Sequence, residues 1–366
     1  VRVMEEKIME TKRNLNPRLL KQIRRVEPYV PGEQPQQKVI KLNTNENPYP
    51  PSPNVARVLK EMDADRLRSD PSAEVLTEAL AAYHGVENDQ IFVGVGSDDV
   101  LSMCFLTFFN AEKPILFPDI TYSFYKVWAQ LYRIPYECPK LDPDFRLVKE
   151  DYYRENGGVI FPNPNAPTAI YEELDFVEDV IAHNPDVIVI VDEAYIDFAG
   201  RSAAELIDRY DNLIVVRTFS KSRSMAGMRI GYAISNPALI GYLNDVKYSF
   251  NSYTMNQTAL VCGVESVKDD AYFKESVEKI IETREWAKTE LTKMGFEFPD
   301  SRANFIFATH PKKDAKQLFE ELKQKQIYVR YWGSSRIEQY LRITIGTRAE
   351  METLFSALRA CLAAEN

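Results

Sequence analysis

The amino-acid sequence predicts an α/β protein, in which a large part is built on a mostly parallel sheet covered by helices on both faces and a smaller part is α+β. From about residue 54, short runs that are apolar throughout alternate with amphipathic helical stretches. Strands that are apolar on both sides are typical of a sheet covered on both faces. After about residue 296 the predicted strands are shorter and runs of consecutive apolar residues are fewer, which indicates that the smaller α+β part begins there.

The predicted elements follow in order along the chain. Residues 1–27 predict a short helix, and the proline- and asparagine-rich residues 28–53 predict an extended arm. The apolar runs predict strands at 91–95, 115–117, 159–161, 187–191 and 213–216. Apolar residues at helical spacing predict long helices over 254–295. The last part is predicted to contain strands at 304–308, 327–330 and 341–345, a helix near 314–326 and a final helix from 348.

These patterns divide the chain into three parts. Residues 1–53 form the N-terminal helix and arm, which we expect to pack on the small domain and on a partner subunit. Residues 54–270 form the large domain and residues 271–366 the small C-terminal domain. A chain of 366 residues fits two domains at roughly 150 residues each.

Composition and charge exclude several classes of protein. A net charge of −9 argues against broad nucleic-acid binding, which needs a basic face, although a local arginine pocket could still bind small anions. The four cysteines form no CxxC pair and the three histidines are isolated, so we expect neither a disulfide framework nor a metal site. No apolar run is long enough to span a membrane and the N-terminus has no apolar signal core, which predicts a cytoplasmic protein.

Asp192 is the first candidate functional residue. It directly follows the apolar run 187–191, and a carboxylate at the carboxyl end of a buried strand is costly unless it is paired. In α/β sheets this edge usually carries the chemistry, so Asp192 could hold a cation such as a protonated ring nitrogen. The alternative is an aspartate that caps the next loop.

Lys221 is the second candidate, because it lies just past the predicted strand 213–216 in the segment TFSKSRSMAGMRIGY. The hydroxyl residues around it and Arg229 make a plausible phosphate site. A desolvated lysine near cations has a lowered pKa and can form a Schiff base. The alternative is a solvated surface lysine.

Weaker signals accompany these two. The segment VGVGSDDVL (93–101) runs from a strand into a helix start, which can bind phosphate or be a simple N-cap. Tyr122 could stack on an aromatic ring or belong to the core. The loop 161–170 (FPNPNAPTAI) is rigid, although it could be only a turn. Arg342 interrupts an apolar strand and needs an anion, which could be an internal salt-bridge partner, and Arg330 precedes it. Together these residues match the needs of pyridoxal phosphate.

The chain resembles the fold-type-I pyridoxal-phosphate-dependent aminotransferases, and most closely the histidinol-phosphate aminotransferases. The resemblance runs nearly end to end, and the lysine segment together with VDEAYIDF is highly specific. The motifs that carry it are EPYVPG, LNTNENPYPPSP, GVGSDDV, TYSFY, PNPNAPT, VDEAYIDF, TFSKSRSMAGMRIGY, NFIF and YLRITIGT.

The resemblance implies roles for residues around the cofactor, pyridoxal 5'-phosphate. Lys221 would bind it as a Schiff base and move the substrate's proton. Asp192 would pair with the ring nitrogen, Tyr195 would hydrogen-bond the ring oxygen, and Tyr122 would stack on the ring. The phosphate would be held by Ser97, Asp98, Ser220 and Arg229.

The resemblance also implies substrates and a partner. Arg342 would bind the anionic end of the substrate and Arg330 a second anionic group, with Asn45 also at the substrate. Tyr29 would reach the pocket of the neighbouring subunit in a homodimer. The implied reaction converts L-histidinol phosphate and 2-oxoglutarate to imidazole-acetol phosphate and glutamate, in histidine biosynthesis.

Two alternatives stay open from the sequence. An aromatic amino-acid aminotransferase or a phospho-amino-acid decarboxylase of the same fold would share nearly every cofactor residue. A non-catalytic pyridoxal-phosphate-binding regulator is disfavoured, because Lys221, Asp192 and Arg229 are all present and no basic DNA-binding domain is visible.

The sequence departs from the family pattern at three places. Ala166 stands where the family has an asparagine that bonds the cofactor, so Asn165, one place earlier, could take that role. Ala169 stands where glycine is common. The usual Tyr-Pro-Asp-Pro is replaced by Arg68-Ser69-Asp70-Pro71. In the family, the tyrosine of this motif touches the cofactor phosphate of the partner subunit. Arg68 could replace the tyrosine as a donor to that phosphate.

Overall fold

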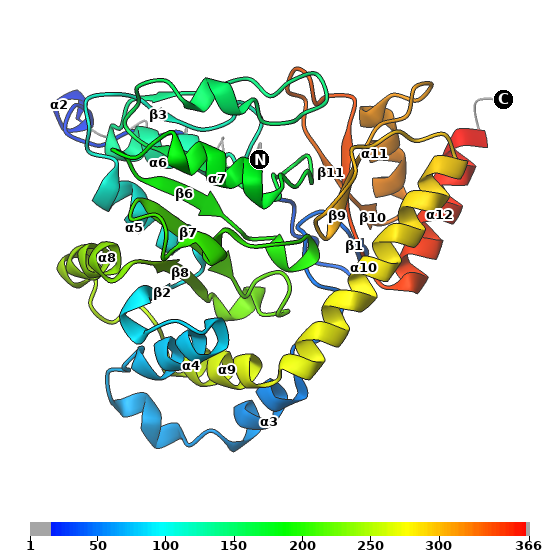
Figure 1. Ribbon diagram of the computed structural model, residues 1–366. Coiled ribbons are helices and arrows are strands. Elements are labelled where there is room, and N and C mark those ends of the chain that lie inside the picture. Colours follow the sequence, from blue (N-terminus) through cyan, green and yellow to red (C-terminus); the bar gives the residue numbers. More distant parts are fainter. Residues whose placement is uncertain (1–15, 364–366) are drawn as a thin grey trace.

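The structure, a computed structural model, describes residues 16–363. It has a large sheet with helices around it and a smaller sheet flanked by long helices (Figure 1). The predicted helix over 1–27 lies partly outside the described residues. Within the described part only α2 (Pro17–Leu20) is helical, so the prediction is wrong for residues 21–27. Leu19 and Ile23 are half exposed there, and a helix this short needs tertiary packing to persist.

The large sheet has seven strands in the order β2-β8-β7-β6-β5-β3-β4. All five predicted apolar runs are strands of this sheet, and β8 runs in the opposite direction to the other six strands. The sequence did not predict β4 or β8. The strands are β2 (Ile91–Gly94), β3 (Ile115–Leu116), β4 (Tyr136–Glu137), β5 (Val159–Pro162), β6 (Val189–Asp192), β7 (Leu213–Thr218) and β8 (Gly231–Ser235).

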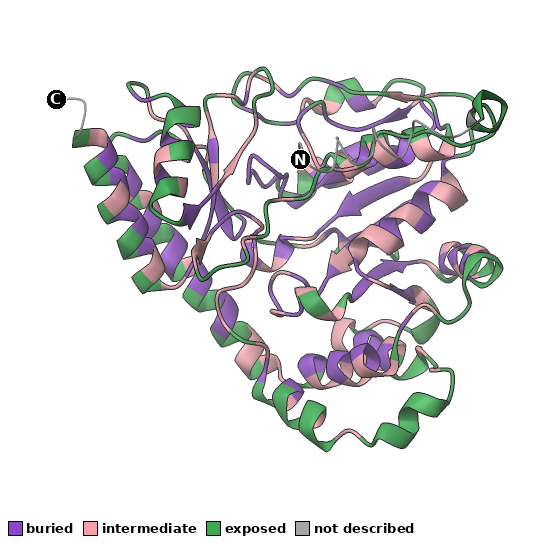
Figure 2. Ribbon diagram, turned by 180° about the vertical axis from the view of Figure 1, so that it is seen from behind, coloured by how far each residue is buried: buried purple, intermediate pink, exposed green. Residues whose placement is uncertain are grey.

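Helices cover both faces of this sheet. Val189 and Val191 of β6 belong to one buried cluster and Ile190 to another, because neighbouring side chains point to opposite faces. α4, α7 and α9 contribute to the first cluster and α5, α6 and α8 to the second. The helices of this part are α3 (Pro53–Glu61), α4 (Glu74–His84), α5 (Ser97–Phe108), α6 (Phe124–Tyr132), α7 (Leu174–Ala182), α8 (Pro237–Phe250) and α9 (Gln257–Lys268). Figure 2 shows the strands buried between them.

The smaller sheet is antiparallel, in the order β11-β12-β9, and has its own hydrophobic cluster. The arm reaches this part, since its strand β1 pairs in parallel with β10. The predicted strands and helices beyond residue 253 all appear. The elements are β1 (Ile40–Lys41), α10 (Asp270–Lys293), β9 (Phe305–Ala308), α11 (Ala315–Gln324), β10 (Ile327–Tyr328), β11 (Arg330–Tyr331), β12 (Leu341–Thr344) and α12 (Arg348–Ala363).

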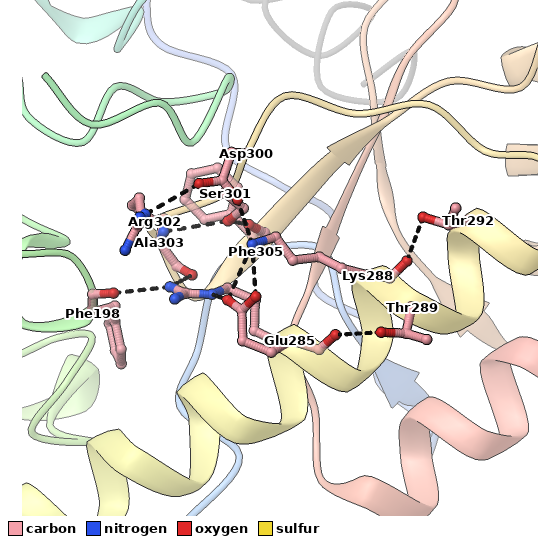
Figure 3. Close-up of polar contacts among 11 residues, drawn as sticks. Phe198, Glu285, Lys288, Thr289, Thr292, Asp300, Ser301, Arg302, Ala303 and Phe305 are labelled. Carbon is pink, nitrogen blue, oxygen red and sulfur yellow. Dashed lines mark hydrogen bonds and ion pairs between the residues drawn. The ribbon is translucent and has the colours of Figure 1, made fainter.

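Polar contacts join α10 to both parts of the molecule. The buried Arg284 of α10 donates hydrogen bonds to the carbonyls of Phe198 (2.9 Å) and Ala303 (3.1 Å). Figure 3 shows this junction, where Lys288 of α10 also bridges Glu285 and Asp300. The loop after β6 is thereby fixed to the segment that leads into β9.

Within residues 16–363, no helix is both long and apolar enough to cross a membrane. Short 3₁₀ helices complete the described elements, at Ala64–Arg68, Asn88–Gln90, Lys149–Tyr152, Ile196–Phe198, Ala203–Leu206 and Ala226–Met228.

Candidate active site

Two adjoining cavities lie beyond the carboxyl ends of the large sheet's parallel strands, where the smaller sheet and the arm meet it. The smaller cavity has a volume of about 160 Å³ and the larger about 560 Å³. Their common wall is formed by Thr44, Tyr122, Ala166, Tyr195 and Lys221.

Asp192 ends β6 and lines the smaller cavity. Its carboxylate accepts hydrogen bonds from the Tyr125 hydroxyl (2.7 Å) and the Ala194 amide (3.2 Å). Burial raises the pKa of Asp192 to about 6, and the two hydrogen bonds lower it only in part. An ionised Asp192 is therefore costly in this position, and a cation beside it would be strongly favoured.

Lys221 lies just past β7 and lines both cavities, so it is not a solvated surface lysine. Its Nζ donates a hydrogen bond to the carbonyl of Thr44 in the arm (3.2 Å). Burial and the nearby Arg342 lower the pKa of Lys221 to about 8. A substantial neutral fraction near physiological pH makes this amine a nucleophile and a base.

Donors for an anion gather at the start of α5, on the wall of the smaller cavity. Ser97 and Asp98 open this helix, and Ser220 and Arg229 line the same cavity. The guanidinium of Arg229 lies 3.3 Å from an oxygen of Asp98, whose other oxygen accepts from the Tyr122 hydroxyl (2.7 Å). A helix N-terminus with an arginine and hydroxyls beside it is a ready site for phosphate.

Two glycines allow this arrangement. A Cβ at Gly231 would lie 2.2 Å from the backbone nitrogen of Ser97, and a Cβ at Gly96 would lie 2.6 Å from the Arg229 guanidinium. Gly96 also has a φ of 85°, which favours glycine. Any larger residue at either place would push β8 or Arg229 away from the start of α5.

Asn45 connects the arm to the two other parts. Its amide donates to the Tyr195 hydroxyl (2.9 Å), and its backbone nitrogen donates to the hydroxyl of Thr344 (3.0 Å) in β12. Asn304 donates to its carbonyl (3.0 Å). Asn45 also lines the larger cavity, but its side-chain amide is engaged in holding Tyr195.

The larger cavity is strongly cationic. Arg330 and Arg342 lie directly opposite each other on β11 and β12. Arg342 donates to the carbonyl of Asn43 (2.9 Å), while its buried Nε has no hydrogen-bond partner within residues 16–363. The charged residues of the lining are Lys140, Lys221, Arg330, Arg336 and Arg342 on one side and Asp119 on the other. In a protein of net charge −9, this concentration of cations indicates an anion-binding site.

Comparison with known proteins identifies the family. The family model described as aminotransferase class I and II matches residues 37–358. Histidinol-phosphate aminotransferases of Lactococcus lactis subsp. cremoris (strain MG1363) and Clostridium botulinum (strain Langeland / NCTC 10281 / Type F) are 51% and 48% identical. They cover 93% and 91% of this chain, which spans 96% and 95% of their lengths. The chain belongs to the histidinol-phosphate aminotransferase family. A solved histidinol-phosphate aminotransferase from Sinorhizobium meliloti, in complex with pyridoxal-5'-phosphate, has the same fold (TM-score 0.82, 24% identity, 90% of this chain and 93% of that one).

Twelve of the fourteen site residues predicted from this family resemblance line one of the two cavities. Those on the smaller cavity are Ser97, Asp98, Tyr122, Asp192, Tyr195, Ser220, Lys221 and Arg229. The larger cavity adds Tyr29, Asn45, Arg330 and Arg342. The two residues that line neither cavity are Asn165 and Arg68.

Asn165 does not take the place of the family's asparagine. Its side-chain nitrogen donates to the carbonyl of Ile120 and to the hydroxyl of Thr168 (both 3.0 Å), and its oxygen accepts from Thr121 (3.1 Å). Ala166, the next residue, lines both cavities instead. Asn165 therefore braces the loop that leads to Tyr122 rather than facing the cavities.

Arg68 and Tyr29 were both predicted to act at the site of a partner subunit. Arg68 ends an exposed 3₁₀ helix between α3 and α4, away from both cavities of its own chain. Tyr29 lines the larger cavity of its own chain. Its ring stacks on Phe124 of α6, with ring centres 4.2 Å apart, and this contact holds it there.

Sequence reasoning missed several residues of the site. Tyr125 donates a hydrogen bond to Asp192. The segment TYSFY could have indicated it, since a buried tyrosine hydroxyl needs a hydrogen-bond partner. A second missed group is centred on Arg217, whose side chain is 12% exposed: it pairs with Glu193 (3.0 Å) and Asp197 (3.5 Å), and Asp197 accepts from the hydroxyl of Ser222. This group ties the loop after β6 to the residue that follows Lys221.

Proposed function

We propose that the protein transfers an amino group between L-histidinol phosphate and 2-oxoglutarate, giving imidazole-acetol phosphate and glutamate, as a step of histidine biosynthesis. The curated relatives that bear the name of this activity support it. One structural observation carries it: the cationic larger cavity adjoins the smaller one and shares Lys221 with it, and the buried Asp192 lines the smaller cavity. An amine-bearing substrate with a distal anion fits that arrangement.

Pyridoxal 5'-phosphate is the cofactor, and the residues present fit it. Lys221 would bind it covalently, Asp192 would face its ring nitrogen, and Tyr122 and Tyr195 would hold the ring. The donors at the start of α5, with Ser220 and Arg229, match a phosphate in both charge and number. The bound cofactor supplies an electron sink for the charge that develops on the substrate carbon when its proton leaves.

The chain's own residues would manage protons and orientation. Lys221 Nζ, with its lowered pKa, can take a proton from the substrate carbon and return it. The Tyr195 hydroxyl accepts from Asn45, which leaves its own hydrogen free to donate. Asp192, held by Tyr125, would keep the ring nitrogen protonated. Arg330 and Arg342 would bind the distal phosphate of one substrate and a carboxylate of the other.

A half-reaction tests the proposal. The protein saturated with pyridoxal phosphate is mixed separately with histidinol phosphate, phenylalanine and glutamate, and bleaching of the cofactor's absorbance is followed. Fast bleaching at low histidinol phosphate, with slower bleaching by phenylalanine, is the expected result. Bleaching by phenylalanine but not by histidinol phosphate would move the enzyme to aromatic amino acids, and release of carbon dioxide from a phospho-amino acid would make it a decarboxylase.

We expect Arg342→Gln to raise the KM of both substrates by about 30- to 150-fold, since loss of a charged hydrogen bond costs about 2–3 kcal/mol. The unpaired buried Nε marks Arg342 as the residue whose bonding is completed by an anion. Steady-state kinetics with each substrate measures the effect. Arg359→Gln is the matched control, because Arg359 is an exposed residue of α12 paired with Glu290. Equal KM values in the two variants would contradict the assignment.

We further propose that the protein is a cytoplasmic homodimer. Each subunit would consist of the arm, the large domain and the small domain, with boundaries at residues 53/54 and 270/271. Exposed apolar side chains around the 3₁₀ helix that ends at Arg68, among them Leu59, Leu67 and Val75, support a covered surface there. In such a dimer the guanidinium of Arg68 would reach the cofactor phosphate of the partner subunit.

Arg68→Ala is therefore expected to weaken binding of pyridoxal phosphate by about 10-fold, the loss of one charge-assisted hydrogen bond. Equilibrium dialysis of the apoprotein measures it, with Arg66→Ala from the same 3₁₀ helix as the control. Unchanged cofactor affinity in a protein shown to be dimeric by sedimentation would remove Arg68 from the site, and a monomer would remove the dimer itself.

A further inference from the structure

The segment between β11 and β12, residues 332–340, crosses from the small sheet to the large one, and we call it the strap. Its two ends continue as the strands that carry Arg330 and Arg342. In its middle, Ile337 is only 7% exposed and belongs to the hydrophobic cluster of the large sheet, with Trp332 and Tyr340 packed against that cluster. The strap is therefore attached to the large part while its strands belong to the small part.

Arg336 makes the polar attachment of the strap. It donates to a carboxylate oxygen of Asp119 (2.9 Å) and to the carbonyls of Leu141 (2.8 Å) and Asp142 (2.9 Å). Asp119 lies after β3, and the two carbonyls lie after β4. The other oxygen of Asp119 accepts from the Leu141 amide (2.9 Å), so the carboxylate also ties these two loops to each other.

The backbone conformation of Arg336 also indicates that the strap is held firmly at this residue. Its φ is 73°, in the left-handed region that residues with a side chain rarely adopt. Such conformations persist where the surrounding contacts hold them, and they concentrate near binding sites. Here the guanidinium's three hydrogen bonds and its position over the ring of Phe145, 5.7 Å from the ring centre, are the contacts that hold it.

The strap forms one wall of the larger cavity, to which it contributes Ser334, Ser335 and Arg336. We propose that Arg336 and Asp119 form a latch that fixes the strap, and through it sets Arg330 and Arg342 relative to Lys221. Arg336 is a positioning residue, because Asp119 already neutralises its charge. The inference deepens the proposed function and rests on it, since it takes the larger cavity as the substrate site.

The kinetic test uses Arg336→Gln, Asp119→Asn and their double variant. Each single change is expected to raise the KM of histidinol phosphate and of 2-oxoglutarate about 10-fold, while kcat stays within about threefold, because small displacements of binding groups weaken both substrates. The double variant should be no worse than the single ones, since all three break the same latch. Asp119→Asn preserves the shape and the bond from Leu141, which guards against a simple folding defect.

Two controls separate the latch from charge alone. Arg336→Lys keeps the charge but loses the fork that reaches Asp119 and both carbonyls, so its KM should rise nearly as much. Lys126→Gln removes one positive charge from an exposed position of α6 that lines neither cavity, and its KM should change less than about threefold. An effect of Lys126→Gln equal to that of Arg336→Gln would overturn the latch in favour of general electrostatics.

Hydrogen exchange of the holoenzyme tests the latch without turnover. In both single variants the amides of residues 333–340 should exchange about 10-fold faster, while those of β6 and α10 are unchanged. Unchanged exchange in the strap, or wild-type KM values, would overturn the latch. Failure of the wild type to act on histidinol phosphate would instead overturn the proposed function, and the exchange result would still decide the latch.

Discussion

Replacement of Lys221 by alanine is expected to lower turnover by at least about 10,000-fold while the chain still folds, because it removes a nucleophile and a proton carrier at once. Among the lysines of residues 16–363, Lys221 is the one that lines both cavities. Since its pKa is lowered from 10.5 to about 8, its neutral fraction at pH 7 is about 300-fold larger than that of an ordinary lysine. Steady-state kcat and thermal unfolding of the purified variant measure the two halves of the expectation.

The same pKa predicts a pH dependence. Covalent attachment of pyridoxal phosphate to the apoprotein needs the neutral amine, so its rate should rise about tenfold per pH unit and level off above about pH 8. Lys221→Arg keeps the charge but cannot lose its proton, so it should be as inactive as alanine. Lys247→Met is the matched control, because Lys247 is also buried but packs on Phe92, away from both cavities. Retained turnover in Lys221→Ala, or its loss in Lys247→Met, would contradict the assignment.

Most of the large sheet could be predicted because burial on both faces leaves a strand with no polar positions. The runs at 159–161 and 187–191 became β5 and β6 for that reason. β8 was missed because Gly231–Ser235 has glycine, alanine and serine at three of its positions, so it forms no continuous run of large apolar residues. Its antiparallel direction depends on pairing with β7, which precedes it, and with β2, which is far away in the sequence, and no local pattern contains that information.

The site was predictable where topology alone places a residue. Asp192 and Lys221 each follow a parallel strand, and the carboxyl ends of such strands share one edge of the sheet. Side-chain direction was not predictable. Asn165 was expected to replace a residue one position away, but neighbouring residues point in different directions, and its amide turns to Ile120 and Thr168.

Contacts between segments far apart in the sequence could not be predicted either. The Thr44 carbonyl meets Lys221 only because the arm folds back along β10, and Arg336 meets Asp119 only because the strap crosses between the sheets. Neither segment has a sequence pattern that specifies its destination. Residues of this kind hold the catalytic groups in place, so sequence reasoning finds the reacting groups more readily than their supports.

Asp192→Asn is expected to remove nearly all activity and yet to stabilise the cofactor-free protein above pH 6. The raised pKa means that folded Asp192 binds its proton more tightly than the unfolded chain does. Stability of the wild type is therefore lost as pH rises from about 4 to about 6. The shift from 3.8 to about 6 corresponds to about 3 kcal/mol, which the asparagine avoids, although a poorer fit to the Ala194 amide offsets part of it.

Urea unfolding of the two apoproteins at pH 4, 5, 6 and 8 measures this difference, which should grow from pH 4 to pH 6 and then stay constant. Glu193→Gln is the neighbouring control with the opposite expectation: Glu193 accepts from Arg217, Ser202 and Ala203, so breaking this buried set should destabilise the protein by about 3 kcal/mol. Pyridoxal phosphate should then stabilise the wild type more than Asp192→Asn, because only the wild type offers its ring nitrogen a carboxylate. An Asp192→Asn apoprotein no more stable than the wild type at pH 8 would mean that Asp192 carries no burial cost. The site would then have no stored preference for a cation at the end of β6.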